Sequence, residues 1–173
     1  MRLSDKNYLK EAYVYASENS TDKSTQNGAI LVNDDGEILA KAANRFPDGV
    51  LETEHRWIRP RKYAFVEHAE RNVIFNAAKQ GIKTEGLTMY CPWAACTDCM
   101  RAIIQSGIKK LVVHYEPLAE SRFGIPAPEQ WRQSILFAIE MLKESGLQLD
   151  VVNEKIFENN NFEFLFNGSK ITP

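Results

Sequence analysis

Apolar residues recur at helical spacing near the start of the chain. Ser4 is a suitable N-cap, and the positions that follow it form one apolar helix face. The residues on that face are Tyr8, Leu9, Ala12, Tyr13 and Ala16. Polar residues from 18 to 26 end the predicted helix. Two short apolar runs, 29–32 and 38–43, then flank turn residues at 33–36, which predicts a β-hairpin.

The rest of the chain alternates between helical and extended patterns. The predicted helices are 68–80, closed by Gly81, then 96–107, and an amphipathic helix from Pro128-Glu129 to Gly146. The predicted strands are 87–91, 110–114 and 147–151. The apolar face of the last helix is assigned to Trp131, Ile135, Leu136, Ile139 and Leu142.

This order of elements predicts an α/β fold in which one mixed sheet carries helices on both faces, a three-layer α/β/α sandwich. The length of 173 residues suits a single domain over 1–173. Two stretches lie outside the regular pattern. A long irregular connection runs from Phe46 to about Tyr63, and the last stretch of the chain, which contains residues 159–161, is expected to be loosely ordered.

Charge and hydropathy narrow the classes of partner. The formal net charge of −2 and the pI near 6.0 provide no overall field that would attract a polyanion. No apolar stretch approaches the ~20 residues that span a bilayer, and residues 1–5 lack the apolar core of a signal peptide. We therefore expect a cytoplasmic protein without a membrane partner.

Three cysteines, Cys91, Cys96 and Cys99, lie within nine positions, which suits a metal site better than a disulfide framework. Cys96 and Cys99 share one face at the start of a predicted helix, where the helix dipole favours thiolate. His68 starts the preceding helix and supplies a third ligand. Zinc held by three protein ligands keeps an open position for water and lowers the pKa of that water to about 7.

Glu70 suits the role of a proton-transferring carboxylate beside such a zinc ion. Residues two apart in mid-helix point about 200° away from each other, but at a helix N-terminus both His68 and Glu70 can lie close to one ion. An alternative is a closed structural site in which Cys91 is a fourth ligand and Glu70 is a solvated helix residue. A Cys-x-x-Cys pair alone does not decide between them. His55 and His114 are expected to be ordinary surface or core histidines.

The order His-x-Glu followed by Cys-x-x-Cys matches the zinc deaminase signature except for its proline. The chain resembles the deoxycytidylate deaminase branch of the cytidine deaminase superfamily over about residues 5–114. Four segments in the family's order carry the resemblance: 24–32, 43–49, 66–74 and 103–110. The resemblance implies the cytidine deaminase-like fold and hydrolytic deamination at C4 of a cytosine-type base.

The resemblance also implies roles for individual residues. His68, Cys96 and Cys99 would bind zinc and Glu70 would act as the catalytic proton shuttle. Asn44 would bond the sugar hydroxyl, and the backbone of Ala69 would meet the pyrimidine carbonyl. Two positions depart from the family pattern, since Ala95 replaces the usual proline and Arg45 replaces a glycine after the asparagine. Arg45 is therefore a candidate substrate contact.

The expected reaction is conversion of dCMP to dUMP and ammonia by a homo-oligomer. A nucleoside, a free base or a modified cytosine nucleotide are alternative substrates, and a non-catalytic zinc-stabilised module is a further class. Four cations between Arg56 and Lys62, together with Arg45, favour a substrate with a 5′-phosphate. The same basic loop motivates a polynucleotide substrate, which the negative overall charge disfavours.

Overall fold

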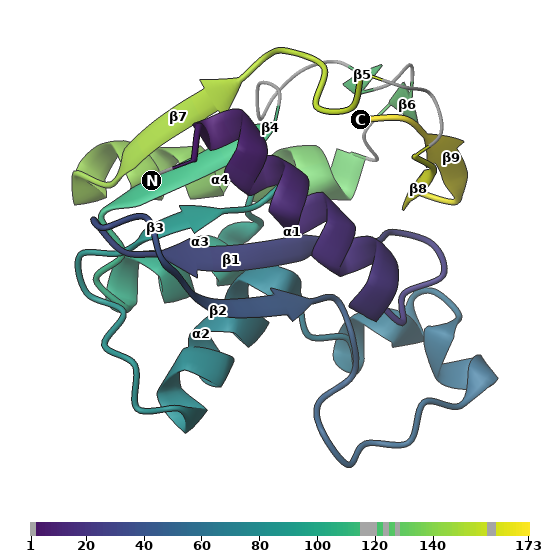
Figure 1. The fold of residues 1–173 in the computed structure, drawn as a ribbon. Helices are drawn as coiled ribbons and strands as arrows, with labels where there is room; N and C mark the ends of the chain where they lie inside the picture. The colour runs from purple at the N-terminus through teal and green to yellow at the C-terminus, as the bar shows by residue number, and fades with distance from the viewer. Residues whose placement is uncertain (1–2, 115–120, 123–124, 127–128, 159–161) are drawn as a thin grey trace.

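The computed structural model describes residues 3–114, 121–122, 125–126, 129–158 and 162–173. Its centre is a five-stranded sheet in the order β2-β1-β3-β4-β7 (Figure 1). The strands are β1 (Gly28–Val32), β2 (Ile38–Ala43), β3 (Thr88–Tyr90), β4 (Lys110–His114) and β7 (Gln148–Val152). Strand β1 pairs antiparallel with β2 and β3, whereas β3, β4 and β7 run parallel. The sheet is therefore mixed, as predicted.

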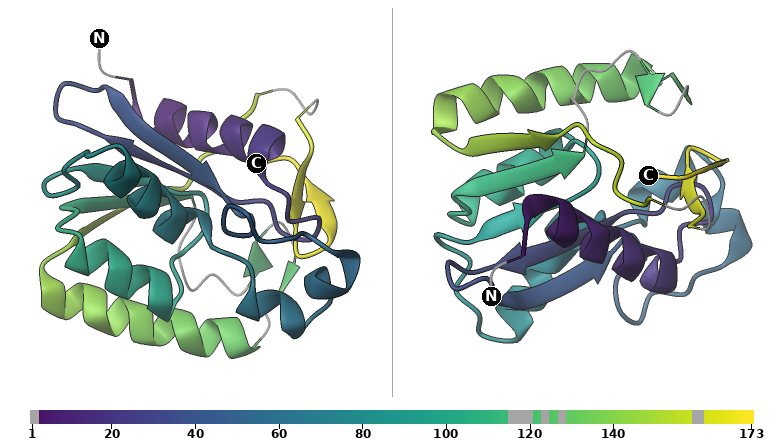
Figure 2. Two further views of the ribbon diagram at one scale, coloured as in Figure 1. Left: turned by 90° about the horizontal axis from the view of Figure 1, so that it is seen from below. Right: turned by 45° about the horizontal axis from the view of Figure 1, so that its top comes forward.

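Helices cover both faces of this sheet, which gives the predicted three-layer sandwich (Figure 2). They are α1 (Asp5–Asn19), α2 (Ala69–Lys79), α3 (Thr97–Gln105) and α4 (Glu129–Ser145). Helix α1 lies on one face, and α2, α3 and α4 lie on the other. In the described part of the chain, none of the helices has the length and apolar composition needed to cross a membrane.

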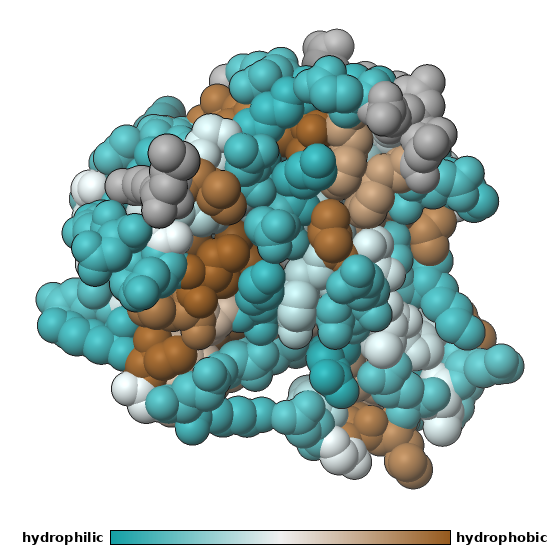
Figure 3. Space-filling model, viewed as in Figure 1, coloured by the Kyte–Doolittle hydropathy of each residue, from teal (hydrophilic) through white to brown (hydrophobic). Residues whose placement is uncertain are grey.

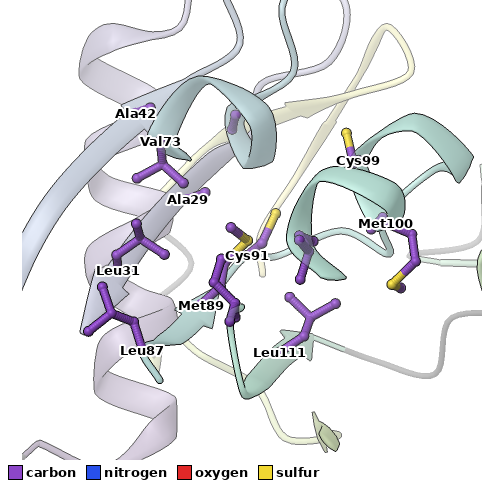
Figure 4. Close-up of a cluster of buried hydrophobic side chains, with 14 of the residues drawn as sticks. Ala29, Leu31, Ala42, Val73, Leu87, Met89, Cys91, Cys99, Met100 and Leu111 are labelled. Atoms are coloured by element: carbon purple, nitrogen blue, oxygen red, sulfur yellow. The ribbon is translucent and has the colours of Figure 1, made fainter. Parts of the chain in front are cut away.

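Side chains on the two faces of the sheet form two cores because successive strand residues point in opposite directions. Ile30, Tyr90 and Val112 pack toward α1. The other core lies beneath α2, α3 and α4 and includes Leu31, Met89 and Leu111 (Figure 4). The parallel pair of strands β3 and β4 is buried on both faces, which explains the nearly continuous apolar run at the end of β4.

Helix α1 follows its sequence signals closely. The Ser4 side chain accepts a hydrogen bond from the backbone N–H of Asn7, as expected of an N-cap. The helix lies so close to β1 that a Cβ atom on Gly28 would stand 2.3 Å from the backbone oxygen of Ala12. Only glycine permits this approach without a backbone shift.

Two sequence predictions were wrong in part. Leu136 is exposed, and Ala138 is the fully buried residue of that stretch of α4. Consecutive helix residues differ by about 100°, so position 136 cannot share a face with 135, 138 and 142. Residues 162–173 are also not a loose tail, because β8 (Phe164–Phe166) and β9 (Ser169–Ile171) form an antiparallel hairpin. Residues 159–161 lie outside the described part.

The hairpin is attached to the segment that precedes β1. Gln26 and Leu165 exchange two hydrogen bonds of 2.9 Å, and Gly168 donates to the backbone oxygen of Ser24. Phe164 is buried against Tyr13, with ring centroids 4.9 Å apart. The remaining short strands are β5 (Ser121–Arg122) and β6 (Ile125–Pro126).

The connection after β2 is more ordered than the sequence suggested. It contains the 3-10 helices η1 (Glu54–Trp57) and η2 (Arg61–Ala64). Its Lys62 is buried and forms an ion pair of 2.5 Å with the buried Asp22, which fixes η2 against the segment before β1. Asp22 thus neutralises a cation that the sequence alone left free, because the two residues are 40 positions apart.

Candidate metal centre and active site

Three side chains converge where α2 and α3 begin. His68 is the N-cap residue of α2, Cys96 is the N-cap residue of α3, and Cys99 lies in the first turn of α3. The Nδ1 atom of His68 is 3.6 Å from both Cys sulfurs. All three possible ligand atoms lie within 4.8 Å of one another, and no other such group occurs among the described residues. One nitrogen and two sulfurs at this separation suit zinc.

Cys91 lies apart from this group. It follows β3, whereas Cys99 is on α3 (Figure 4). The sulfur of Cys91 lies 3.3 Å from Nδ2 of the Asn27 amide. The structure therefore gives no support to a closed site with Cys91 as fourth ligand. His55 is bonded to Thr53, and the buried His114 is bonded to Tyr13 and the backbone of Glu154, so both lie outside the group as expected.

The cluster is arranged to hold negative charge on sulfur. A hydrogen bond from Cys99 lowers the pKa of Cys96 to about 3. Burial raises this pKa, and the hydrogen bond with His68 lowers it further. The bond between the two cysteines raises the pKa of Cys99 well above its usual range, and burial acts in the same direction. Burial lowers the pKa of His68, but its bond with Cys96 and the charge of Glu70 outweigh this and raise the pKa.

Glu70 is on the first turn of α2 and is 2% exposed. Burial raises the pKa of its carboxyl above the usual range, against the opposing charge of His68. Its Oε2 atom accepts a hydrogen bond of 3.1 Å from the side chain of Asn27. A carboxyl group with a raised pKa beside a cluster of side chains that could hold a metal ion is suited to take up and release protons.

A cavity of about 290 Å³ opens beside His68 and Cys96. Its other lining residues come from the connection after β2, from α2 and α3, and from α4. They are Tyr63, Val66, Arg71, Thr97, Asp98, Trp131 and Ser134. The Trp131 ring lies 5.5 Å from that of Tyr63 and 5.8 Å from that of His68, so aromatic surfaces border the space above the cluster. Its volume is close to the lower end of the range for small-molecule sites.

Two contacts that support the cluster were missed by the sequence analysis. The guanidinium of Arg71 lies 3.5 Å from the sulfur of Cys99 and also pairs with Glu67. Ser134 of α4 accepts a hydrogen bond from the N–H of Thr97, the first residue of α3, at 3.0 Å. Since Cys96 makes no capping bond with its own side chain, Ser134 supplies the cap from another helix. The position of Arg71, one residue after Glu70, could have marked it in the sequence, whereas no sequence pattern marks Ser134.

The three predicted substrate contacts are not in the lining of the cavity. Asn44 is buried, and its Oδ1 atom accepts a bond of 2.8 Å from the N–H of Ala69. Its Nδ2 atom donates to the backbone oxygen of Thr25. Arg45 pairs its backbone with Glu67, and its half-exposed side chain lies 3.7 Å from Asp48. Asn44 and Ala69 thus join the end of β2 to the start of α2.

The α/β/α sandwich, with a histidine, two cysteines and a buried glutamate at the starts of two helices, defines the class of zinc-dependent nucleobase deaminases. Residues 3–115 match the family model described as the cytidine and deoxycytidylate deaminase zinc-binding region. The chain belongs to this family.

Known relatives agree with this assignment. The chain is 32% identical to a deoxycytidylate deaminase of Homo sapiens over 111 residues, which are 61% of each chain. It is 50% identical to a deoxycytidylate deaminase of Enterobacteria phage T4 over 64 residues, covering 36% of this chain and 33% of that protein. The matches to the mammalian relatives thus span about three fifths of their length.

Solved structures extend the comparison to the fold. The dCMP deaminase from the cyanophage S-TIM5, crystallised with dCMP and dUMP, is similar with a TM-score of 0.64 and 27% identity. The match covers 85% of this chain and 95% of that chain. The predicted fold class and family are therefore both confirmed.

Proposed function

We propose that this protein hydrolyses the exocyclic amino group of dCMP to give dUMP and ammonia. The observation that carries the proposal is the buried Glu70 beside the converging ligand atoms of His68, Cys96 and Cys99. The similar structure from cyanophage S-TIM5 was solved with dCMP and dUMP, which supports this choice of substrate and product. The relatives described as deoxycytidylate deaminases support it as well.

The donor set of one imidazole and two thiols fits zinc, and the lowered pKa of Cys96 favours the thiolate form that binds a metal. We propose His68, Cys96 and Cys99 as the protein ligands. Zinc with three protein ligands would activate a water molecule for attack on C4 of the pyrimidine. Arg71 would offset part of the negative charge on the two sulfurs.

Glu70 would perform the proton transfers of the reaction. Hydrolysis at C4 requires a proton at N3 of the ring and later a proton on the departing amine. Burial favours the neutral carboxyl, which can deliver a proton. After delivery, the carboxylate is stabilised by the N–H of the Asn27 amide. The water that adds to C4 loses both of its protons in the reaction, and Glu70 can take them up in turn, so it can give one proton to N3 and one to the departing amine.

Asn44 and Ala69 remain proposed contacts to the substrate, on the basis of the family resemblance. The Asn44 amide keeps one hydrogen and one lone pair beyond its bonds to Thr25 and Ala69, so it can still bond a sugar hydroxyl. The Ala69 N–H has a single hydrogen, which Asn44 already accepts. A contact from Ala69 to the pyrimidine carbonyl would therefore need a shared hydrogen bond.

Measuring ammonia release from dCMP and from deoxycytidine tests the substrate and its 5′-phosphate. A phosphate contact of about 1.5 to 3 kcal/mol should make dCMP at least about tenfold better in kcat/KM. Lys62 is not available for this contact, because it is buried with Asp22. We expect Arg59→Ala, Arg61→Ala or Arg45→Ala to reduce the preference for dCMP, with the rate on deoxycytidine unchanged.

The matched control is Lys83→Ala, which removes an exposed cation paired with Glu85 far from the connection after β2. Its preference for dCMP should equal that of the parent. Equal efficiency on dCMP and deoxycytidine would refute the phosphate contact and assign the protein to nucleosides. Including cytosine and a cytosine-containing oligonucleotide in the same screen tests the remaining alternatives.

We further propose that copies of the chain assemble through the helical layer. Phe75 of α2 and Leu136 and Phe137 of α4 are large apolar side chains that are between 42% and 51% exposed on this layer. Light scattering after size exclusion should give a mass above that of one chain. Phe137→Ser should lower it, and the monomer mass for the parent protein would contradict the proposal.

The face seen in Figure 3 is mainly hydrophilic, with apolar residues gathered in a strip beside α1.

The cysteines bear on the compartment in which the protein works. The three cysteines are free, and two of them belong to the proposed metal site. Thiols kept for metal binding suit a reducing compartment, so we propose that the protein works in the cytoplasm.

A further inference from the structure

Asn27 connects the two polar side chains that lie beneath the site, Glu70 and Cys91. It precedes β1 directly and is 5% exposed. Its Nδ2 atom lies 3.1 Å from Oε2 of Glu70 and 3.3 Å from the sulfur of Cys91. The Cys91 sulfur is 3.5 Å from Oδ1 of Asn27, a distance at which the thiol can donate to that oxygen. These contacts use both ends of the Asn27 amide.

The bond from Asn27 restricts the direction of the Glu70 carboxyl group. A glutamate side chain has three rotatable bonds, and a proton shuttle is effective only when its oxygens stay within reach of the proton's donor and acceptor. Asn27 holds one oxygen, Oε2, so that the other can face the cluster of His68, Cys96 and Cys99. Asn27 carries no charge, so it does not neutralise the carboxylate as an arginine would.

Asn27 is itself held rigidly. Its backbone oxygen accepts a bond of 3.0 Å from the N–H of Asn44, and the preceding Gln26 bonds to Leu165 and to the indole N–H of Trp93. The Cys91 sulfur lies within 3.5 Å of both ends of the amide and so restricts its rotation, and the Glu70 carboxylate determines which end points at it. With the amide turned around, its oxygen would face the carboxylate oxygen and two acceptors would meet.

We propose that Asn27 is a positioning residue for Glu70 and that Cys91 orients the Asn27 amide. This inference rests on the proposed function, since it assigns Asn27 to the proton transfer that Glu70 performs. It also gives Cys91 a purpose other than metal binding. No residue of this group other than Glu70 is required to touch the substrate.

A double-mutant cycle tests whether Asn27 acts through Glu70. Asn27→Ala should lower kcat on dCMP by about 10-fold to 100-fold, the usual range for a residue that supports a catalytic group. Zinc content and KM should stay within twofold of the parent, because neither the ligands nor the cavity lining changes. In the Glu70→Gln background, the same Asn27→Ala change should alter kcat by less than twofold.

Equal loss of kcat in both backgrounds would overturn the inference, because it would show a general structural effect of Asn27. A loss of zinc or a rise in KM alone would overturn it as well. If Glu70→Gln itself leaves kcat unchanged, the proposed function fails, and this result is distinct from failure of the positioning role. Asn76→Ala is the matched control, because this amide of α2 donates a hydrogen bond to the backbone oxygen of Lys41 in β2 and has no contact with Glu70 among the described hydrogen bonds.

Substitutions at Cys91 keep the inference testable if Asn27→Ala does not fold. Cys91→Ser retains a donor for Oδ1 of Asn27 and should keep kcat within threefold of the parent. Cys91→Val has a similar size but no donor, and it should lower kcat at least fivefold while zinc content and thermal stability are kept. Equal kcat for the serine and valine variants would contradict the orienting role of Cys91.

Discussion

Replacing Cys99 by alanine should remove zinc from the purified protein and abolish deamination. Cys99 is fully buried and supplies one of only three ligand atoms in the cluster. Its loss leaves one imidazole and one thiol, too few protein ligands to hold a tetrahedral zinc ion. Metal analysis of the parent should give about one zinc per chain, and the variant should give almost none. Cys96→Ala should behave in the same way.

Cys91→Ser serves as the control, because it removes the third cysteine without changing the proposed ligands. It should retain the zinc content of the parent. Loss of zinc from this variant to the same extent as from Cys99→Ala would show that Cys91 is a ligand after all. The site would then be closed to water, and the catalytic proposal would be rejected together with its mechanism.

Glu70→Gln should lower kcat on dCMP by about 10²-fold to 10⁴-fold, the usual contribution of a general acid–base residue. The amide has nearly the same shape and can still accept the hydrogen bond from Asn27, but it cannot exchange a proton. Zinc content and thermal stability should therefore be preserved. Steady-state kinetics and metal analysis of the same preparation would measure all three properties.

Glu85→Gln is a suitable control because that carboxylate is exposed and pairs with Lys83 in the turn after α2. Its kcat should equal that of the parent. Turnover of Glu70→Gln within threefold of the parent would reject the proposed mechanism. Loss of zinc from Glu70→Gln would point to a different role, in which the carboxylate is a metal ligand.

The sequence predicted most of the fold because the local signals agree with the tertiary structure. The cap at Ser4, the turn at 33–36 and the glycines that end α2 and α3 all lie where the elements change. Strand β4 was predicted with its observed bounds because it is apolar on both faces. Leu136 was misplaced because the number of apolar residues in α4 exceeds what one helix face can bury.

The ligand cluster was also predictable, since His68, Cys96 and Cys99 lie at helix starts with recognisable spacing. The residues that support them were not. Ser134 reaches Thr97 across 37 positions, and Asn27 reaches Glu70 across 43. Serine and asparagine occur throughout the chain, so neither residue type marks a site. Only the packing of helices on the sheet shows which of them contact the cluster.

The paired hydrogen bonds between Gln26 and Leu165 have a consequence for the order in which the molecule assembles. The two residues are 139 positions apart, so this contact closes a very long loop. During synthesis the chain emerges from its N-terminus, and α1, the first hairpin and α2 can associate before residue 165 exists. The segment that carries Asn27 gains its last anchor only after that residue has been made. The three ligand atoms of the cluster all come from residues before position 100, whereas the segment that carries Asn27 is also anchored by residue 165.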